Sequence, residues 1–396
     1  MNKKIFCMVL TGMMTVILAA CGGRTDNTES KINVITETQM ETETETESAD
    51  ALTLEQKVGQ LFIVRPDALD SSQESDQVND AGADGVTEVT DTMKGMLAKY
   101  PVGGVCQFGK NIIDPDQIIR FNNELQSASE IPMFIAVDEE GGLVARLANN
   151  DAFDLPKYES AAVGASGDAD AALEMGKTIG NYLREYGFNL DFAPDADVNT
   201  NPDNPVIGTR AFSSDAQTAA DMVSAAAKGL REEGILPTLK HFPGHGDTAE
   251  DSHTSLAVSN KSLEELEACE FLPFQADSGM HAVMMGHIAV PNVTGNDTPA
   301  SLSEEMVNMV PDKEHTLIVT DSLSMQAITD AHPSGEAAVM AFEAGCDVLL
   351  MPVDLEAAYN AILEAVQNGT ISEERLDASV NKILYYKQQF CGNKKD

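Results

Sequence analysis

The segment from Ala216 to His241, AQTAADMVSAAAKGLREEGILPTLKH, contains one helix–strand unit. Residues 216–233 have helical periodicity, and Gly234 separates them from the apolar run Ile235 to Leu239. Lys240 and His241 then follow directly after this predicted strand. An amphipathic helix next to a short apolar strand is typical of α/β proteins with a parallel sheet.

The same alternation extends through the chain from about Leu52. Seven further runs predict strands, namely Leu61 to Val64, Gly104 to Phe108, Met133 to Val137, Phe188 to Phe192, Ala282 to Met285, Leu317 to Thr320 and Val348 to Met351. Candidate helices lie between and after them, at Asp116 to Ser127, Ala169 to Tyr186, Ser262 to Gln275, Ser334 to Ala344, Leu355 to Asn368 and Glu373 to Gln389. Eight strands predict a single closed (β/α)8 TIM-type barrel over residues 52–390. The alternative is an open doubly wound sheet, but no GxGxxG or P-loop follows the first strand.

Nearly every predicted strand ends in polar residues. In a parallel barrel these carboxyl ends open on one face, so their side chains converge. The residues are Arg65 to Asp67, Asp138 to Glu140, Asp195, Lys240 with His241, Gly286 with His287, Asp321 and Asp354. We therefore expect one polar pocket at this face.

The first 51 residues predict export and anchoring rather than fold. Residues 1–20 have a positive start, an apolar stretch and small residues before Cys21, as in a secretory signal peptide. The Leu-Ala-Ala-Cys ending resembles the bacterial lipoprotein signal and predicts lipidation of Cys21; the alternative is an ordinary cleaved signal. Residues 21–51, rich in Thr-Glu pairs, predict a disordered acidic linker. The expected location is the outer side of the cell membrane, with the lipid on Cys21 as the anchor.

Composition excludes broad classes of partner. The 396 residues include 25 Lys plus Arg against 64 Asp plus Glu, a formal charge of −39, which disfavours extended contact with nucleic acid or an anionic membrane surface. A second acidic stretch, about Asp67 to Asp91, predicts a surface insertion. Six cysteines without a CxxC pair suggest neither a disulfide scaffold nor structural zinc, and whether Cys269 pairs with Cys391 stays open. We expect no cofactor and no obligate protein partner.

The most informative loop is KHFPGHGDTAEDSH, residues 240–253. His241 and His245 have HxxxH spacing, but Pro243 and Gly244 prevent the helix that would align them on a metal. An acid/base role fits better, because Asp251 lies two residues from His253 and could orient its imidazole and favour the protonated form. The alternative is a solvated histidine beside a solvated aspartate.

Asp321 lies at the end of the apolar strand in the segment VTDSLSM, residues 319–325. A carboxylate held rigidly at a barrel mouth suits the nucleophile of a glycoside hydrolase. It could equally be the N-cap of the following helix.

The loop KHFPGHG…DSH, the segment TDSLSM and the segment VDEEGG…R together resemble glycoside hydrolase family 3, in particular its bacterial β-N-acetylhexosaminidase (NagZ-type) branch. The similarity extends from Leu52 to about Gln389. It implies a (β/α)8 barrel and retaining hydrolysis of terminal β-linked N-acetylhexosamine in two steps. Family 3 β-glucosidases that are similar to this barrel draw their acid/base from a further domain, so a chain ending at Asp396 is expected to use the loop histidine.

The resemblance also implies roles for individual residues. Asp321 matches the nucleophile that forms a covalent glycosyl-enzyme, and His253 with Asp251 matches the acid/base dyad. The family's sugar contacts match five residues, namely Asp138, Arg146, Arg210, Lys240 and His241, and His287 is a further candidate.

Three positions depart from the family pattern. Glu139 replaces a glutamine, Leu143 replaces an arginine, and Ala211 replaces a serine after Arg210. The first two remove an amide and a guanidinium near the pocket wall. We expect the departures to affect substrate preference and not the reaction.

Two classes of alternative remain. One is another specificity, β-glucosidase or β-xylosidase; the other is a lipid-anchored glycan-binding protein that has lost catalysis, although Asp321 and His253 are both present. For the natural substrate, cell-wall muropeptides are the first expectation and chitin-type oligosaccharides the second.

Overall fold

The computed structural model describes residues 48–392 apart from 74, 81, 251, 253 and 254. The predicted signal peptide, Cys21 and most of the predicted linker therefore lie outside the described residues, as do Asp251 and His253. Among the described residues, no helix combines the length and the apolar character needed to cross a membrane.

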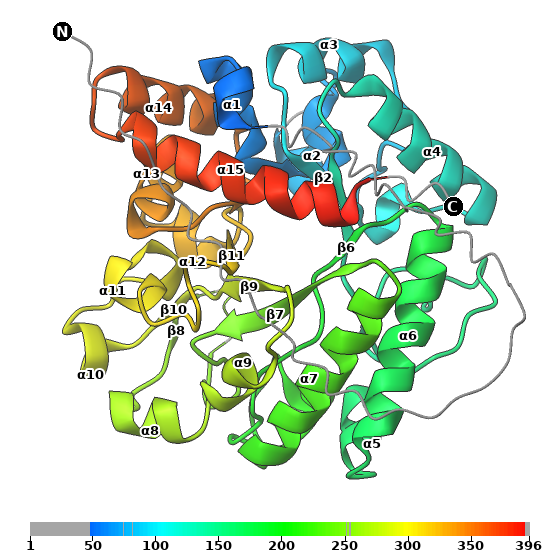
Figure 1. Ribbon diagram of the computed structural model, residues 1–396, viewed down its shortest axis with the longest axis vertical. Helices are drawn as coiled ribbons and strands as arrows, with labels where there is room; N and C mark the ends of the chain where they lie inside the picture. The colour runs from blue at the N-terminus through cyan, green and yellow to red at the C-terminus, as the bar shows by residue number, and fades with distance from the viewer. Residues whose placement is uncertain (1–47, 74, 81, 251, 253–254, 393–396) are drawn as a thin grey trace, which may run out of the picture. The chain divides into compact units, whose positions relative to one another are not determined.

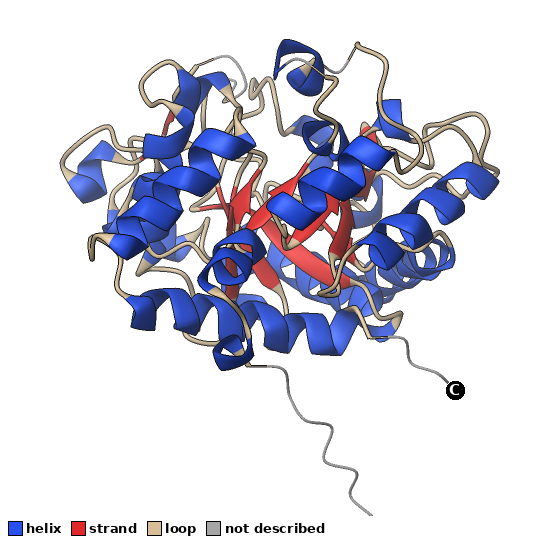
Figure 2. Ribbon diagram, turned by 90° about the horizontal axis from the view of Figure 1, so that it is seen from above, coloured by secondary structure: helices blue, strands red, loops and turns tan. Residues whose placement is uncertain are grey.

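Eight parallel strands form the centre of the fold, and helices surround them (Figures 1 and 2). The strand order is β11-β9-β7-β6-β3-β2-β1-β12. The strands are β1 (Phe62–Val64), β2 (Gly104–Cys106), β3 (Phe134–Val137), β6 (Leu190–Asp191), β7 (Leu236–Phe242), β9 (Ala282–Met285), β11 (Leu317–Thr320) and β12 (Leu349–Leu350). A parallel bridge between Val319 and Val348 joins the ends of this order, so the sheet closes into a barrel. All eight predicted strands and the TIM-type barrel are confirmed.

Helices follow most strands. The longer ones are α1 (Leu54–Gln60), α3 (Asp91–Lys99), α4 (Pro115–Ala128), α6 (Ala169–Glu185), α7 (Ala216–Glu232), α13 (Ser334–Ala344), α14 (Leu355–Gln367) and α15 (Glu373–Phe390). The shorter ones are α2 (Ser75–Asn79), α5 (Ser160–Gly164), α8 (Leu263–Ala268), α9 (Leu272–Ala276), α10 (Pro291–Thr294), α11 (Glu304–Val307) and α12 (Gln326–Thr329). Five short 3-10 turns complete the described helices, namely η1 (Ala49–Ala51), η2 (Pro66–Leu69), η3 (Gly109–Asn111), η4 (Gly208–Arg210) and η5 (Ala300–Leu302).

Helix α7 illustrates why these segments fold as they do. Asp215 caps it by accepting a hydrogen bond from the Thr218 N–H at 2.9 Å, as an N-terminal aspartate does. Small residues let it approach α6 closely, since a Cβ on Gly176 would lie 2.2 Å from the Ala226 carbonyl oxygen. The alanine-rich pattern that predicts this helix therefore also fixes its packing.

One predicted helix is divided in the structure. Residues 262–275 form α8 and α9, with Cys269 between them in a non-helical conformation. Pro273 explains the break, because its ring has no N–H for the carbonyl of Cys269 and would clash with it.

Helix α15 closes the amino-terminal end of the barrel and crosses the front of Figure 1. The Tyr386 hydroxyl lies 3.0 and 2.8 Å from the carbonyl oxygens of His281 and His315, just before β9 and β11. The Lys387 ammonium donates to Gln60 Oε1 at 2.5 Å, just before β1. The carboxyl ends of the strands are thus the open end.

Four further short strands lie outside the barrel. Strands β4 (Glu139–Gly141) and β5 (Val144–Ala145) form an antiparallel hairpin directly after β3. Strands β8 (Ala257–Val258) and β10 (Ile288–Ala289) pair in parallel beyond β7 and β9. Both pairs lie at the open end, because they follow the carboxyl ends of barrel strands.

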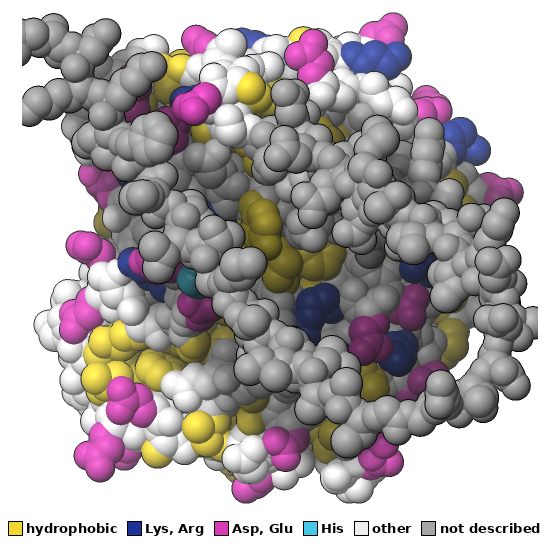
Figure 3. All heavy atoms as spheres, in the orientation of Figure 1, with side chains coloured by type: hydrophobic (Ala, Val, Ile, Leu, Met, Phe, Trp, Pro, Cys, Tyr) yellow, Lys and Arg dark blue, Asp and Glu magenta, His cyan; other side chains and the backbone are white. Residues whose placement is uncertain are grey.

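Acidic side chains lie around the outline of the face seen in Figure 3, and hydrophobic side chains gather over α8 and α10. The predicted insertion at 67–91 contains η2 and α2; most of its described residues are exposed or half-buried, with Val78 and Val86 as buried anchors. Cys106, Cys269, Cys346 and Cys391 are free thiols, so Cys269 and Cys391 do not pair.

Candidate active site

A cavity of about 660 Å³ opens at the carboxyl ends of the barrel strands. Six of the residues expected at the site line it: Asp138, Arg146, Arg210, Lys240, His241 and Asp321. They lie in the last residues of β7 or in the segments after β3, β6 and β11, as the rule for TIM barrels predicts. The structure therefore brings these residues together in one place.

The hairpin β4–β5 reverses the chain and so brings Arg146 next to Asp138. Gly141 and Gly142 have φ values of +87° and +58°, a left-handed conformation that favours glycine and lets the chain reverse there. As a result, Arg146 Nη2 lies 3.4 Å from Asp138 Oδ2. The other Asp138 oxygen accepts from Lys240 Nζ at 2.8 Å.

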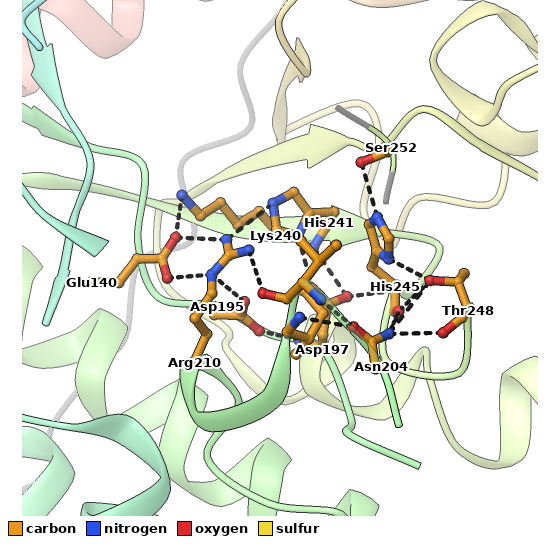
Figure 4. A network of polar contacts seen from close by, with 12 residues as sticks. Glu140, Asp195, Asp197, Asn204, Arg210, Lys240, His241, His245, Thr248 and Ser252 are labelled. Atoms are coloured by element: carbon orange, nitrogen blue, oxygen red, sulfur yellow. Dashed lines mark hydrogen bonds and ion pairs between the residues drawn. The ribbon is translucent and has the colours of Figure 1, made fainter. Parts of the chain in front are cut away.

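Glu140 is buried and lies next to Arg210 and Lys240 (Figure 4). Arg210 binds it with two parallel hydrogen bonds of 2.9 and 2.8 Å. Lys240 Nζ lies 2.6 Å from the same carboxylate. Lys240 thus bridges Asp138 and Glu140. Together with Arg210, these residues form one network of four charged side chains.

This network keeps its carboxyl groups ionised. Burial alone would raise the pKa of Glu140, but the charges of Arg210 and Lys240 outweigh it and lower the pKa to about 2. For Asp138, the charges of Lys240 and Arg146 likewise outweigh burial and hold the pKa well below its usual range. Asp138 is therefore an anionic acceptor at the cavity, suited to binding sugar hydroxyls.

Asp197, in the segment after β6, organises the loop that follows β7. Its Oδ2 lies 2.7 Å from His241 Nδ1, and its Oδ1 accepts from the His245 N–H at 2.6 Å. Burial raises the pKa of Asp197, but His241 and His245 outweigh it, so the pKa lies below its usual value. Because an ionised carboxylate only accepts, Nδ1 of His241 carries the proton and Nε2 faces Arg210 Nη2 at 3.4 Å.

Asp195, Asp197 and His241 have ligand atoms close enough to one another for a metal ion. Their surroundings do not favour one, because Arg210 Nε lies 3.5 Å from Asp195 Oδ2 and Asp197 is already engaged by His241 and His245. Burial and the neighbouring Asp197 raise the pKa of Asp195 well above its usual value, which favours a neutral carboxyl group. We therefore derive no step through a metal.

Asp321 lies directly after β11. Its N–H donates to the Met285 carbonyl at 2.9 Å, and its Oδ1 accepts from the Ser322 N–H at 2.7 Å. Buried His287 does not line the cavity; its Nε2 lies 2.8 Å from the Ser322 carbonyl oxygen. His287 therefore supports the backbone next to Asp321, which differs from the expected contact with substrate.

The proposed dyad, Asp251 and His253, lies outside the described residues. Ser252, between them in sequence, is buried and lines the cavity. The loop that contains the dyad thus reaches the same cavity as Asp321.

The three positions that depart from the family pattern are not among the residues that line the cavity, although Asp138, Glu140 and Val144, next to Glu139 and Leu143 in the chain, are. Glu139 is buried and accepts from the N–H groups of Leu147 and Ala148 at 2.8 and 2.9 Å and from the Tyr182 hydroxyl at 2.9 Å. Leu143 is 74% exposed on the hairpin turn. Ala211 is buried but is not part of the wall.

Sequence reasoning assigned no role to four residues of the site: Glu140, Asp197, His245 and Arg65. Arg65 donates to Asn79 Oδ1 and Ser324 Oγ at 2.7 and 3.1 Å and lies over the Phe108 ring. The polar strand end at 138–140 pointed to Glu140. For Asp197 and His245 the partners lie about 45 residues away, and spacing does not reveal them.

Comparisons with known proteins agree with this geometry. Residues 53–385 match the glycosyl hydrolase family 3 N-terminal domain. The chain is 32% identical over 338 residues to "Beta-hexosaminidase A" of Pseudoalteromonas piscicida, an alignment covering 76% of this chain and 56% of that protein. It is also 32% identical over 332 residues to "Beta-hexosaminidase LpqI" of Mycobacterium tuberculosis, with 76% and 80% coverage.

Among solved structures, a family 3 β-N-acetylglucosaminidase from Paenibacillus sp. str. FPU-7 superposes with a TM-score of 0.76 and 38% identity. That match covers 85% of this chain and 62% of the Paenibacillus chain, so the chain spans little more than half to three fifths of these two relatives. The matched region contains the whole barrel and its cavity. This chain belongs to glycoside hydrolase family 3.

Proposed function

We propose that this protein is a retaining exo-β-N-acetylhexosaminidase, which removes terminal non-reducing N-acetyl-β-hexosamine residues. The observation that carries the proposal is the single cavity in which Asp321 meets the network of Asp138, Lys240 and Arg210. The names of the relatives, β-hexosaminidase and β-N-acetylglucosaminidase, support the choice of sugar.

The proposed reaction has two displacements. Asp321 attacks the anomeric carbon to form a glycosyl ester while the imidazolium of His253 donates a proton to the leaving oxygen. The imidazole of His253, oriented by Asp251, then removes a proton from water as that water cleaves the ester. Asp138, Arg146 and Lys240 hold the sugar hydroxyl groups by charged hydrogen bonds during both steps.

Asp138, Arg210 and Lys240 line the same cavity and can hold one sugar ring by directed hydrogen bonds, which supports an exo mode. Groups around one end of a cavity can surround a single sugar ring, whereas chain-internal cleavage needs an open cleft.

The test follows the stereochemistry of hydrolysis by NMR with 4-nitrophenyl N-acetyl-β-glucosaminide, with the matching glucoside as comparison. We expect the β-anomer to be released first, and the N-acetyl substrate to be strongly preferred. First release of the α-anomer would contradict the retaining mechanism, and preference for the glucoside would favour the β-glucosidase alternative.

We also propose that Cys21 is lipidated and anchors the protein on the outer side of the cell membrane, where cell-wall glycan fragments are its first substrates. The support is the sequence of residues 1–21 alone. Expression of wild type and Cys21→Ala, followed by membrane fractionation and mass spectrometry of the amino terminus, tests this. Equal membrane association of both proteins would contradict it.

A further inference from the structure

His245 lies at the centre of the loop after β7 and is only 1% exposed (Figure 4). Both of its ring nitrogens contact hydroxyl groups of the same loop. Nδ1 lies 2.6 Å from Thr248 Oγ1, and Nε2 lies 2.9 Å from Ser252 Oγ. The imidazole therefore spans the inside of the loop and joins its first half to Ser252.

The first half of the loop is fixed to the segment after β6. The His245 N–H donates to Asp197 Oδ1 at 2.6 Å. Asn204 Nδ2 donates to the carbonyl oxygens of His245 and Thr248 at 2.8 and 3.0 Å, and Asn201 Nδ2 donates to Thr248 at 3.0 Å. Gly246 packs so closely that a Cβ there would lie 1.9 Å from the Val198 carbonyl oxygen. These contacts with the segment after β6 hold the backbone of His245 in place.

The imidazole is suited to hold, not to transfer, a proton. Burial lowers the pKa of His245 despite the opposing effect of Asp197, which favours the neutral ring. A neutral ring has one donor and one acceptor nitrogen, and a hydroxyl group can complement either. Both contacts are therefore satisfied without a charge inside the loop.

Ser252 is the far end of this connection. It is 2% exposed, lines the cavity and is flanked in sequence by Asp251 and His253. Ser252 is therefore the described residue that connects His245 to the part of the chain next to the proposed acid/base dyad.

We propose that His245 and Ser252 are positioning residues for proton transfer: their hydrogen bond fixes the loop so that the acid/base dyad meets the leaving oxygen. This inference rests on the proposed function, because it assigns the acid/base to His253. A displacement of about 1 Å in such a group can cost roughly a hundredfold in rate.

The test compares two substrates that share the N-acetylglucosaminyl group. N,N′-diacetylchitobiose needs its leaving oxygen protonated, and the 2,4-dinitrophenyl glycoside does not. We expect Ser252→Ala to lower kcat/KM for diacetylchitobiose about 10- to 100-fold and to leave kcat/KM for the dinitrophenyl glycoside unchanged. Thr248→Val removes the hydroxyl group that contacts His245 Nδ1. It should likewise lower kcat/KM for diacetylchitobiose relative to kcat/KM for the dinitrophenyl glycoside.

Ser255→Ala is the matched control, because Ser255 is an exposed serine of the same loop. It should match wild type with both substrates, and thermal denaturation should show that Ser252→Ala is folded. Equal losses on both substrates, or no loss on either, would overturn the inference while the proposed function stands. Failure of the wild-type protein to cleave either substrate would overturn both.

Discussion

Lys240 and Glu140 show how charge is arranged at the residue scale. Lys240 joins two carboxylates, and Arg210 supplies a second cation to the buried one. Breaking a buried ion pair from one side leaves an uncompensated charge, which is more costly than replacing the whole pair. Glu140 therefore stabilises both the fold and the orientation of Lys240 toward the cavity.

The first prediction concerns Glu140→Gln. We expect the free energy of unfolding to fall by about 3–5 kcal/mol, because Arg210 loses its carboxylate partner. The rate of hydrolysis of the 4-nitrophenyl substrate should also fall, since Asp138 is then the only carboxylate of the network that still orients Lys240. Urea denaturation measures the first effect, with Glu264→Gln, an exposed glutamate on α8, as the control. Equal stability of Glu140→Gln and wild type would contradict this account of the network.

The second prediction is the pH dependence of stability. Glu140 has its pKa lowered from 4.5 to about 2, so the unfolded chain binds a proton first as the pH falls. Its contribution is complete above pH 4.5 and is lost between about pH 4.5 and 2, at up to about 1.4 kcal/mol per pH unit. The unfolding free energy of wild type should therefore fall more steeply over this range than that of Glu140→Gln. Parallel curves would show that folding does not lower the pKa of Glu140.

At the element scale, the first half of the loop after β7, from His245 to Thr248, packs against the segment after β6. Gly246 makes the closest approach between them. A residue with a Cβ cannot fit there unless one of the two backbones moves.

The third prediction compares two glycine substitutions. Gly246→Ala should displace the loop and lower activity toward diacetylchitobiose at least tenfold, roughly the scale of a positioned acid/base. Gly95→Ala, on exposed helix α3 with open space around it, should keep activity and raise stability by about 0.5–1 kcal/mol. Kinetics and thermal denaturation measure both. Full activity of Gly246→Ala would mean that this close approach does not position the loop.

The same scale shows what sequence can predict. Each of the eight barrel strands overlaps a mostly apolar run of four or five residues that can be recognised in the sequence, even where the strand itself, as in β6 and β12, has two residues. Hairpin β4–β5 and pair β8–β10 lie in no such run and leave little pattern. The prediction of one continuous helix over residues 262–275 was wrong, because Pro273 divides it into α8 and α9.

Barrel geometry gathers most of the polar strand ends at the cavity, as predicted. The exceptions are Asp67, Glu139, Asp195, His287 and Asp354, which do not line it. Asp197 was missed because its partners His241 and His245 lie 44 and 48 residues away. His245 was considered only as a metal ligand, because the sequence does not show that its ring turns toward Thr248 and Ser252 inside the loop.

At the scale of the whole molecule, α15 covers one end of the barrel and the cavity occupies the other. The fourth prediction follows from this shape. Chitooligosaccharides should be shortened from the non-reducing end, with N-acetylglucosamine as the product released at every step. Mass spectrometry of early time points, on substrates labelled at the reducing end, checks this. Early release of disaccharides would contradict an exo mode.

The most direct test of the central claim is covalent trapping with a fluorinated N-acetylglucosaminyl inactivator, followed by mass spectrometry of the digested protein. The account predicts one sugar on the peptide that contains Asp321, and no label in Asp321→Ala. A sugar attached to any other residue would contradict the assignment of Asp321 as the nucleophile.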